Sequence, residues 1–131
     1  MRPALILLAV SPLLMAQVAM AQTEPRLPRA RCDFGVGLTH LADVERDAAP
    51  PPANLAEGRA RGERAVTQLR SAARVFLGCG CPRLAELTTE AASVASSAPS
   101  EASVARILQI MEQLRFRMQL VREQSERQGC R

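Results

Sequence analysis

The chain reads Cys79-Gly80-Cys81-Pro82 between two segments with helical periodicity. Gly78 and Gly80 are typical helix-ending residues, because glycine readily adopts the left-handed backbone conformation found just after a helix. Proline is favoured at the first position of a helix. The stretch therefore predicts a tight turn that ends one helix near Gly78 and begins the next at Pro82.

The segment before this turn is predicted to form a long helix. Asn54 is a favoured N-cap residue, and Glu57 three residues later completes a capping box. Small and apolar residues then recur at three- and four-residue steps and form one narrow stripe. The stripe consists of Leu55, Gly58, Gly62, Ala65, Leu69, Ala72 and Phe76. Gly58 and Gly62 weaken a helix interior, so their place on the stripe predicts close approach of another backbone.

A shorter helix is expected over about residues 33–47, with Gly35 and Gly37 weakening its first turn. The three consecutive prolines at 50–52 end it, since proline cannot continue a helix. Its expected inner face is Phe34, Leu38, Leu41, Ala42 and Glu45. The part of the chain before the turn is therefore predicted to be a helical hairpin.

A second hairpin is expected after the turn. Its first helix starts at Pro82 and loses its pattern before Pro99, and Ser100 is the predicted N-cap of its second helix. The expected inner face of the first helix is Leu84, Leu87, Ala91 and Val94. The broad apolar face of the second helix is Val104, Ile107, Leu108, Ile110, Met111, Leu114, Met118 and Val121.

The two hairpins align with each other when Cys32 is set against Cys81. The matched pairs include Leu38 with Leu87, Ala42 with Ala91, Leu55 with Val104, Leu69 with Met118 and Ala72 with Val121. An internal period of this kind favours a duplicated helical hairpin.

The predicted fold is all-α: a small, disulfide-stapled, up-down-up-down four-helix bundle made of two pseudo-repeated hairpins. A three-helix bundle is the alternative. In the repeat, Gly58 corresponds to Ile107 and Gly62 to Met111. If the two long helices face each other, small residues receive large ones, which is how a core reaches native packing density.

Residues 1–21 have the features of a secretory signal peptide. Residues 4–15 form an apolar h-region, and Ala19-Met20-Ala21 is a small-residue cleavage site. The product is expected to be periplasmic or secreted, with no stable membrane insertion after cleavage.

The mature chain is predicted to hold one domain. Residues 22–31 contain two prolines and three arginines without a period, and they are expected to form a flexible N-terminal arm. Residues 32–131 form the single helical domain.

The four cysteines, Cys32, Cys79, Cys81 and Cys130, predict two disulfides in an exported chain of this size. The favoured connectivity is Cys32–Cys79 with Cys81–Cys130, each bond stapling one hairpin. Cys32–Cys81 with Cys79–Cys130 is the next candidate, and a Cys79–Cys81 bond is disfavoured because so small a ring strains disulfide geometry. The first and third helices are expected to be much shorter than the second and fourth, so the long helices must end early, or their tails must fold back, for these bonds to form.

The Cys79-Gly80-Cys81 motif also permits a chemical interpretation. A strained disulfide would be readily reduced, and clustered thiolates bind zinc or copper(I). The even cysteine count favours structural bonds instead, and His40 lies too far along its helix to join a cluster at the cysteines. No cofactor or resident metal is expected.

Catalytic residues are not expected either. Asp43 and Asp47 are four residues apart, as are Glu86 and Glu90, and both pairs resemble solvated helix faces with arginines nearby. The single histidine leaves no basis for a triad, and no nucleophile-elbow or phosphate-loop motif occurs. All 17 basic residues are arginine, but the net charge of +4 is too small and too evenly mixed to indicate a nucleic-acid surface.

The function expected is therefore that of a non-catalytic binding or interaction module, whose partner is another envelope or secreted protein. Phe116 and Leu120 fall opposite the apolar face of the last helix. Together with Arg115, Arg117 and Arg122 they form the predicted partner surface. The alternative is a thiol-redox or soft-metal-binding protein that works through Cys79-Gly80-Cys81.

Overall fold

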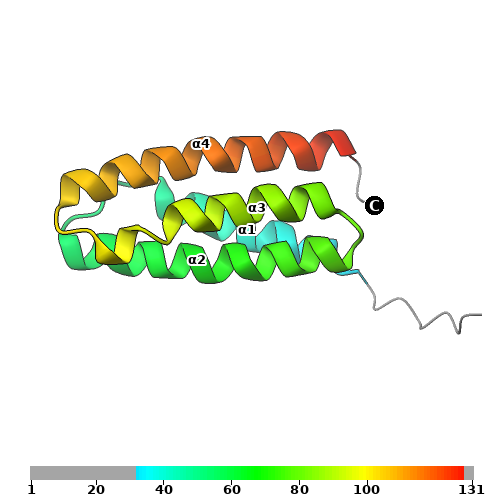
Figure 1. Ribbon diagram of the computed structural model, residues 1–131, viewed down its shortest axis with the longest axis horizontal. Helices are drawn as coiled ribbons and strands as arrows, with labels where there is room; N and C mark the ends of the chain where they lie inside the picture. Colours follow the sequence, from blue (N-terminus) through cyan, green and yellow to red (C-terminus); the bar gives the residue numbers. More distant parts are fainter. Residues whose placement is uncertain (1–31, 129–131) are drawn as a thin grey trace, which may run out of the picture.

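The computed structural model describes residues 32–128. The predicted signal peptide, the N-terminal arm and Cys130 lie outside this range. Within it the chain forms α1 (Phe34–Ala48), α2 (Leu55–Gly78), α3 (Pro82–Ala95), a single 3-10 turn η1 (Ala98–Ser100) and α4 (Val104–Gln128), with no strand. The four α-helices run up, down, up and down (Figure 1), which confirms the four-helix bundle over the three-helix alternative.

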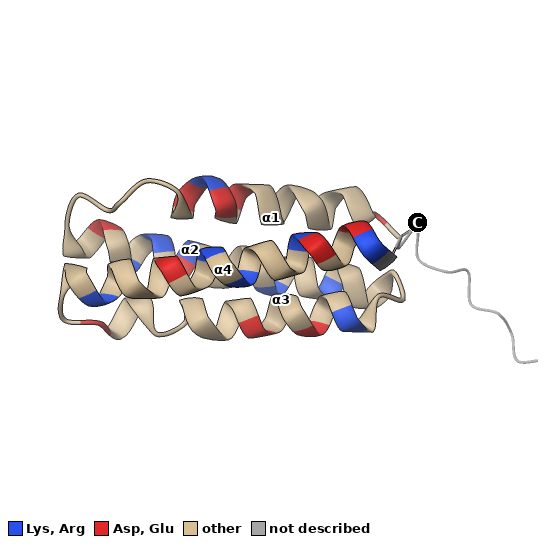
Figure 2. Cartoon of the chain, turned by 90° about the horizontal axis from the view of Figure 1, so that it is seen from above, with Lys and Arg blue, Asp and Glu red and all other residues tan. Residues whose placement is uncertain are grey.

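Successive helices are neighbours, so α2 packs against both α1 and α3, and α4 packs against both α3 and α1. Seen from above, α1 and α3 lie on either side of α4 (Figure 2). The two long helices α2 and α4 are therefore diagonal partners and meet over a short stretch. None of the helices within residues 32–128 is both long and apolar enough to cross a bilayer.

The start of α2 has the capping interactions expected of Asn54 and Glu57, with one difference. The Asn54 side chain accepts a hydrogen bond from the Glu57 backbone N–H at 2.9 Å. The Glu57 carboxylate accepts one from the Ala53 N–H at 2.8 Å, and not from the N–H of Asn54 itself. Two backbone donors are thus satisfied where the chain enters the helix.

The predicted stripe of α2 is its buried face, from Gly58 to Phe76. A Cβ on Gly58 would lie 2.8 Å from Ile107 Cγ2 of α4, so this glycine does receive the large residue expected. A Cβ on Gly62 would lie 2.5 Å from the Cβ of Ala98 in η1. Gly62 therefore faces η1, and the expected contact with Met111 was wrong, because η1 packs against α2 at this position.

The difference in helix length is accommodated at the end of the bundle away from the cysteines. The helices α1 and α3 have 15 and 14 residues, whereas α2 and α4 have 24 and 25. The extra turns of the long helices extend past α1 and α3 at the end where Figure 1 shows the two long connections. There the buried residues Pro52 and Ala98 cover them, so the long helices stay level with the short ones at the cysteine end.

The inner face of α1 differs from the one predicted. Leu38 is 40% exposed and Ala42 is exposed, whereas Val44 is only 1% exposed and Gly37 is buried. The cause is Gly37, whose missing side chain leaves room for the ring of Phe76 on α2. The helix is therefore rotated so that Gly37, Leu41, Val44 and Ala48 face inward.

The internal repeat holds for the long helices but shifts for the short ones. In α2 and α4 the matched residues Leu69 and Met118 are both buried, as are Ala72 and Val121. The alignment that sets Cys32 against Cys81 matches Leu41 of α1 with Glu90 of α3. The buried residues of the two short helices instead match when Leu41 is set against Thr88. The matches of Leu38 with Leu87 and of Ala42 with Ala91 were therefore wrong.

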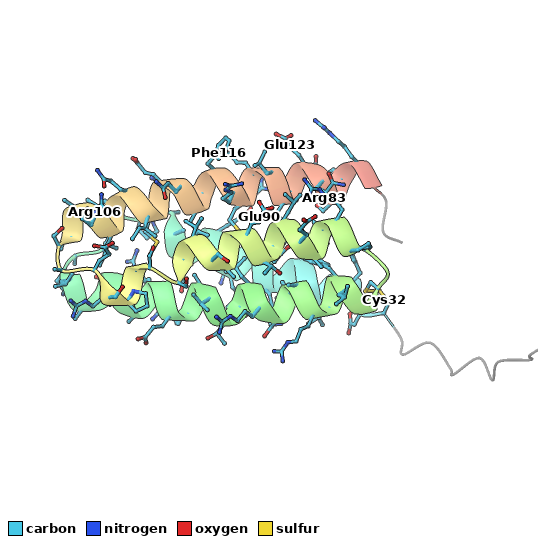
Figure 3. The ribbon with its side chains drawn as sticks, in the orientation of Figure 1. Cys32, Arg83, Glu90, Arg106, Phe116 and Glu123 are labelled. Carbon is cyan, nitrogen blue, oxygen red and sulfur yellow. A yellow bond between two sulfur atoms is a disulfide. The ribbon has the colours of Figure 1, made fainter. Side chains whose placement is uncertain are left out.

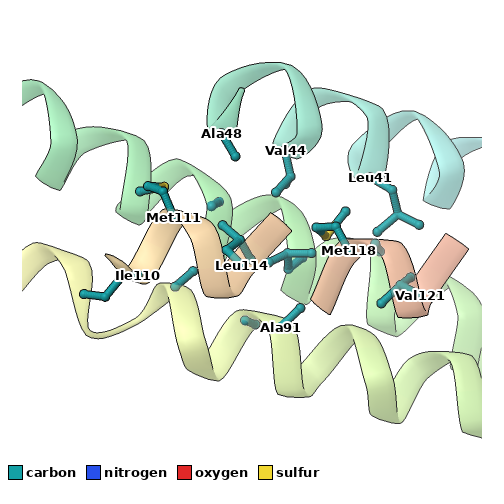
Figure 4. Close-up of a cluster of buried hydrophobic side chains, with 14 of the residues drawn as sticks. Leu41, Val44, Ala48, Ala91, Ile110, Met111, Leu114, Met118 and Val121 are labelled. Atoms are coloured by element: carbon teal, nitrogen blue, oxygen red, sulfur yellow. The ribbon is translucent and has the colours of Figure 1, made fainter. Parts of the chain in front are cut away.

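The N-terminus of α4 also differs from its prediction. Ser100 ends the 3-10 turn, and the Ser103 hydroxyl accepts the hydrogen bond from the Arg106 N–H at 3.3 Å. Ser103 is thus the capping residue. Beyond it, α4 places Leu114 and Met118 against α1 and Ala91 of α3 in one continuous core (Figure 4).

Candidate functional site

The turn between α2 and α3 is a Schellman motif. Gly80 has a φ of +78°, the left-handed conformation that glycine adopts without strain. The Gly80 N–H donates to the Leu77 carbonyl at 3.0 Å, and the Cys81 N–H donates to the Phe76 carbonyl at 2.9 Å. The backbone bonds of the turn therefore place Cys79 and Cys81 on either side of a rigid glycine.

This turn is joined to the start of α1 by a disulfide between Cys32 and Cys79, whose Cα atoms are 4.9 Å apart. The bond is the first pair of the favoured connectivity. The structure therefore contains neither Cys32–Cys81, which was the next candidate, nor the disfavoured Cys79–Cys81 bond. The Cys81 side chain is buried among core residues at 2% exposure. Its predicted partner Cys130 lies outside the described residues.

The redox hypothesis needs a bond between Cys79 and Cys81, and metal binding needs free thiolates, whereas Cys79 is bonded to Cys32. Among residues 32–128 no group of three or more His, Cys, Asp or Glu side chains is placed to hold a metal ion. His40 lies on α1, where its Nδ1 forms a hydrogen bond with Gln68 Oε1 of α2. This hydrogen bond links α1 to α2 at a point away from the cysteines.

The two carboxylate pairs do not converge on a common site. Asp43 pairs with Arg46 at 3.1 Å on α1, and Glu86 pairs with Arg83 on α3. Asp47 reaches α2 and pairs with Arg64 at 2.9 Å. Glu90 pairs with Arg117 of α4, so each of the four carboxylates forms an ion pair with an arginine. Figure 2 shows the two signs of charge scattered along the helices.

Two arginines of the predicted partner surface connect α4 to its neighbours. Arg117 pairs with Glu90 of α3 at 3.1 Å, and Arg122 pairs with Glu45 of α1. The hydrogen bond that Arg122 donates to the Glu45 carboxylate raises the pKa of the Arg122 guanidinium above its ordinary value. Both arginines thus link α4 to a neighbouring helix of the bundle.

The other three residues of that surface are divided between two sides of α4. Phe116 is 58% exposed and points away from the bundle (Figure 3), and Leu120, one turn later, is half-buried. Arg115 pairs loosely with Glu112 at 3.8 Å. That these five residues act as one partner surface stays a prediction.

A small cleft lies between α1 and α4 and has a volume of about 210 Å³. Arg115 and Arg122 line it beside Glu45, over a floor that includes Ala48 and Met118. Glu45 already neutralises Arg122 here, so the cleft has little unbalanced charge.

A larger groove lies between α2 and α3 and has a volume of about 420 Å³. We call it the α2–α3 groove; its lining residues are Arg70, Ala73, Arg74, Leu77, Ala85 and Thr89. Its surface is mainly apolar and it is open to solvent. Leu77 is 62% exposed, more than the other large hydrophobic residues whose exposure stands out.

The two arginines of the α2–α3 groove differ from most others in the molecule. Within residues 32–128, neither Arg70 nor Arg74 forms an ion pair with an acidic side chain. Arg74 donates to the Ser71 hydroxyl at 3.3 Å. The groove thus combines an apolar surface with two positive charges, one helical turn apart, that form no ion pair with the part of the chain that the structure describes.

This groove was not predicted from the sequence. The available signals were Arg70 and Arg74 at a four-residue spacing, and Leu77 lying off the apolar stripe of its helix. The facing residues Ala85 and Thr89 are small, so the surface between the helices is concave. Their position opposite Arg70 and Arg74 depends on the pairing of α2 with α3, which single-helix periodicity does not show.

A polar network around Arg61 holds the connection between α1 and α2. Arg61 pairs with Glu57 and also donates to the backbone carbonyls of Asp47, at 3.1 Å, and Pro50. The hydrogen bond from the Ala53 N–H and then the one from Arg61 lower the pKa of the Glu57 carboxyl below its ordinary value. This network is structural, because it satisfies carbonyls at the end of α1.

Comparisons of this chain with protein-family models, with curated proteins and with solved structures found no match.

Proposed function

We propose that this protein is an exported, non-catalytic binding module whose partner docks in the α2–α3 groove. The observation that carries the proposal is the groove itself, where the highly exposed Leu77 lies beside Arg70 and Arg74. A mainly apolar groove bordered by charged side chains is typical of a protein interaction site. Arginine beside an apolar anchor is typical of the residues that contribute most binding energy at interfaces.

The scaffold supports this role because it holds the groove in a fixed shape. Both walls are regular helices, and the Schellman motif at Gly80 joins them at one end of the bundle. Ala73 and Ala85 have short side chains with little conformational freedom to lose. A preformed surface of this kind lowers the entropic cost of binding.

The proposal includes export to the periplasm or the exterior, which follows from the signal-peptide features of residues 1–21. The partner would accordingly be another envelope or secreted protein. The thiol-redox or metal-binding alternative receives less support, because Cys79 is bonded to Cys32.

Site-specific photo-crosslinking tests the proposal. A benzophenone amino acid replaces Leu77 in one variant and Leu38 in the matched control, and each variant is produced in the exported fraction of the native host. Both positions are exposed leucines, but Leu38 lies on α1, away from the groove. We expect a discrete protein adduct from position 77 and none from position 38.

The captured protein is then purified and titrated by calorimetry. We expect Leu77→Ser to weaken binding about tenfold or more, as for an interface anchor, and Leu38→Ser to leave it unchanged. No adduct from position 77, identical adducts from both positions, or equal affinity of Leu77→Ser and the unmodified protein would overturn the proposal.

A further inference from the structure

We infer that the element recognised by the α2–α3 groove is an acidic amphipathic helix of the partner protein. This inference rests on the proposed function and specifies the chemistry of its ligand. It follows from the charges of the groove, from its shape and from the size of its lining side chains.

The charges of the groove favour an acidic ligand. Arg70 and Arg74 lie one turn apart on α2 and have no acidic partner within residues 32–128. By contrast, Arg117 and Arg122 pair with acids of neighbouring helices. Two carboxylates at a four-residue spacing on a helix of the partner match the spacing of the two arginines. Arginine and carboxylate form charge-assisted hydrogen bonds, which are stronger than neutral ones.

The shape of the groove favours a helix. It runs between two adjacent helices, α2 and α3, and its lining includes the small residues Ala73, Ala85 and Thr89. Small side chains let the ridge of a third helix enter the groove between two others. Leu77 provides an exposed apolar contact at the cysteine end of the groove. This is the mode in which an amphipathic helix places its apolar face in a groove.

Two other ligands agree less well with these observations. A small anionic molecule would normally be enclosed over most of its surface, but this groove is open to solvent. An anionic membrane would be contacted by several protruding apolar residues. In this groove Leu77 is highly exposed, but the apolar floor at Ala73 and Ala85 is buried.

The test uses a fluorescent synthetic peptide, an amphipathic helix with leucine on one face and pairs of glutamate one turn apart beside them. Matched peptides carry glutamine or lysine in place of glutamate. Binding to the full mature protein is measured by fluorescence anisotropy. The groove variant is Arg70→Gln with Arg74→Gln. The control is Arg46→Gln with Arg127→Gln, which removes the same charge from two highly exposed side chains outside the groove.

We expect the glutamate peptide to bind the unmodified protein at least tenfold more tightly than the glutamine peptide, and the lysine peptide to bind more weakly still. The groove variant should lose about tenfold in affinity or more, and the control variant should bind like the unmodified protein. Rising salt should weaken the binding, because the arginines are exposed to solvent.

Equal loss in the groove and control variants would show a non-specific charge effect and would overturn the inference. So would equal affinity for the glutamate and glutamine peptides, or binding to phosphatidylglycerol vesicles that depends on Arg70 and Arg74 without any binding of the peptide. If no peptide binds but the crosslink from position 77 forms, this inference fails and the proposed function stands. If both tests are negative, both fail.

Discussion

Gly37 of α1 lies directly against the ring of Phe76 on α2. A Cβ on Gly37 would be 2.5 Å from Phe76 Cε1, which is closer than a real contact allows. Phe76 is fully buried and its ring also packs against Phe34, with centroids 5.2 Å apart. The absence of a side chain at Gly37 therefore sets how closely α1 approaches α2 and which face of α1 points inward.

Gly37→Ala should destabilise the protein for this reason. Overpacking of a core costs about 1–3 kcal/mol, and the gain in helix propensity recovers up to about 1 kcal/mol. Gly35→Ala is the matched control, because the nearest atom to its added Cβ would be Asp33 Oδ1 at 3.8 Å. Urea denaturation should show a loss for Gly37→Ala and no loss, or a gain, for Gly35→Ala. Equal midpoints would refute the close contact.

Leu69→Ala should destabilise the bundle by about 2–4 kcal/mol, the usual cost of truncating a buried leucine. Leu69 is completely buried in the core, near the middle of α2. Leu77→Ala, on the same helix but 62% exposed, should change the free energy of unfolding by less than about 0.5 kcal/mol. A midpoint for Leu69→Ala equal to that of the unmodified protein would remove this residue from the core.

Ser103→Ala should cost about 0.5–2 kcal/mol, because it removes the N-cap of α4. Its hydroxyl accepts the hydrogen bond from the Arg106 N–H. Ser100→Ala is the control, since the Ser100 hydroxyl instead donates to the Ser97 carbonyl at 3.0 Å. Thermal unfolding followed by circular dichroism compares the two variants. A larger loss for Ser100→Ala would place the cap where the sequence alone predicts it.

Glu57 should make the stability of the protein depend on pH in the acidic range. Its pKa is lowered in the folded state, so the ionised carboxylate stabilises the fold above its ordinary pKa of 4.5. This contribution is lost as the pH falls below that value and through the lowered pKa. Urea denaturation between pH 7 and pH 3 should therefore show a smaller loss of stability for Glu57→Gln than for the unmodified protein. Parallel losses would contradict the role of the Ala53 and Arg61 hydrogen bonds.

Features encoded by neighbouring residues were predicted well from the sequence. The turn at Gly80 and the cap at Asn54 each depend on residues within one helical turn. The long periodic stripe of α2 was also predicted, because many residues repeat the same signal. The face of α1 was not, since Leu38 and Val44 are equally apolar and the choice between them depends on Phe76, which is distant in sequence.

The α2–α3 groove was not predicted from the sequence, for a similar physical reason. Arg117 and Arg122 were assigned to a partner surface, but their acidic neighbours Glu90 and Glu45 come from other helices. The sequence of α2 alone gave no reason to distinguish Arg70 and Arg74 from the other arginines. Which arginines lack a partner is decided by the packing of helices far apart in sequence, and this packing also creates the α2–α3 groove.

The measurement that tests the account most directly is disulfide mapping of the mature protein from an oxidising compartment. Free thiols are first alkylated, and the non-reduced protein is digested with trypsin, which leaves Cys79 and Cys81 together on residues 75–83. Electron-transfer fragmentation then separates the two cysteines. We predict a link from Cys32 to Cys79 and no alkylation of either cysteine of the turn. A ring closed between Cys79 and Cys81, or alkylation of both, would contradict a structural turn and would make its thiol chemistry the function.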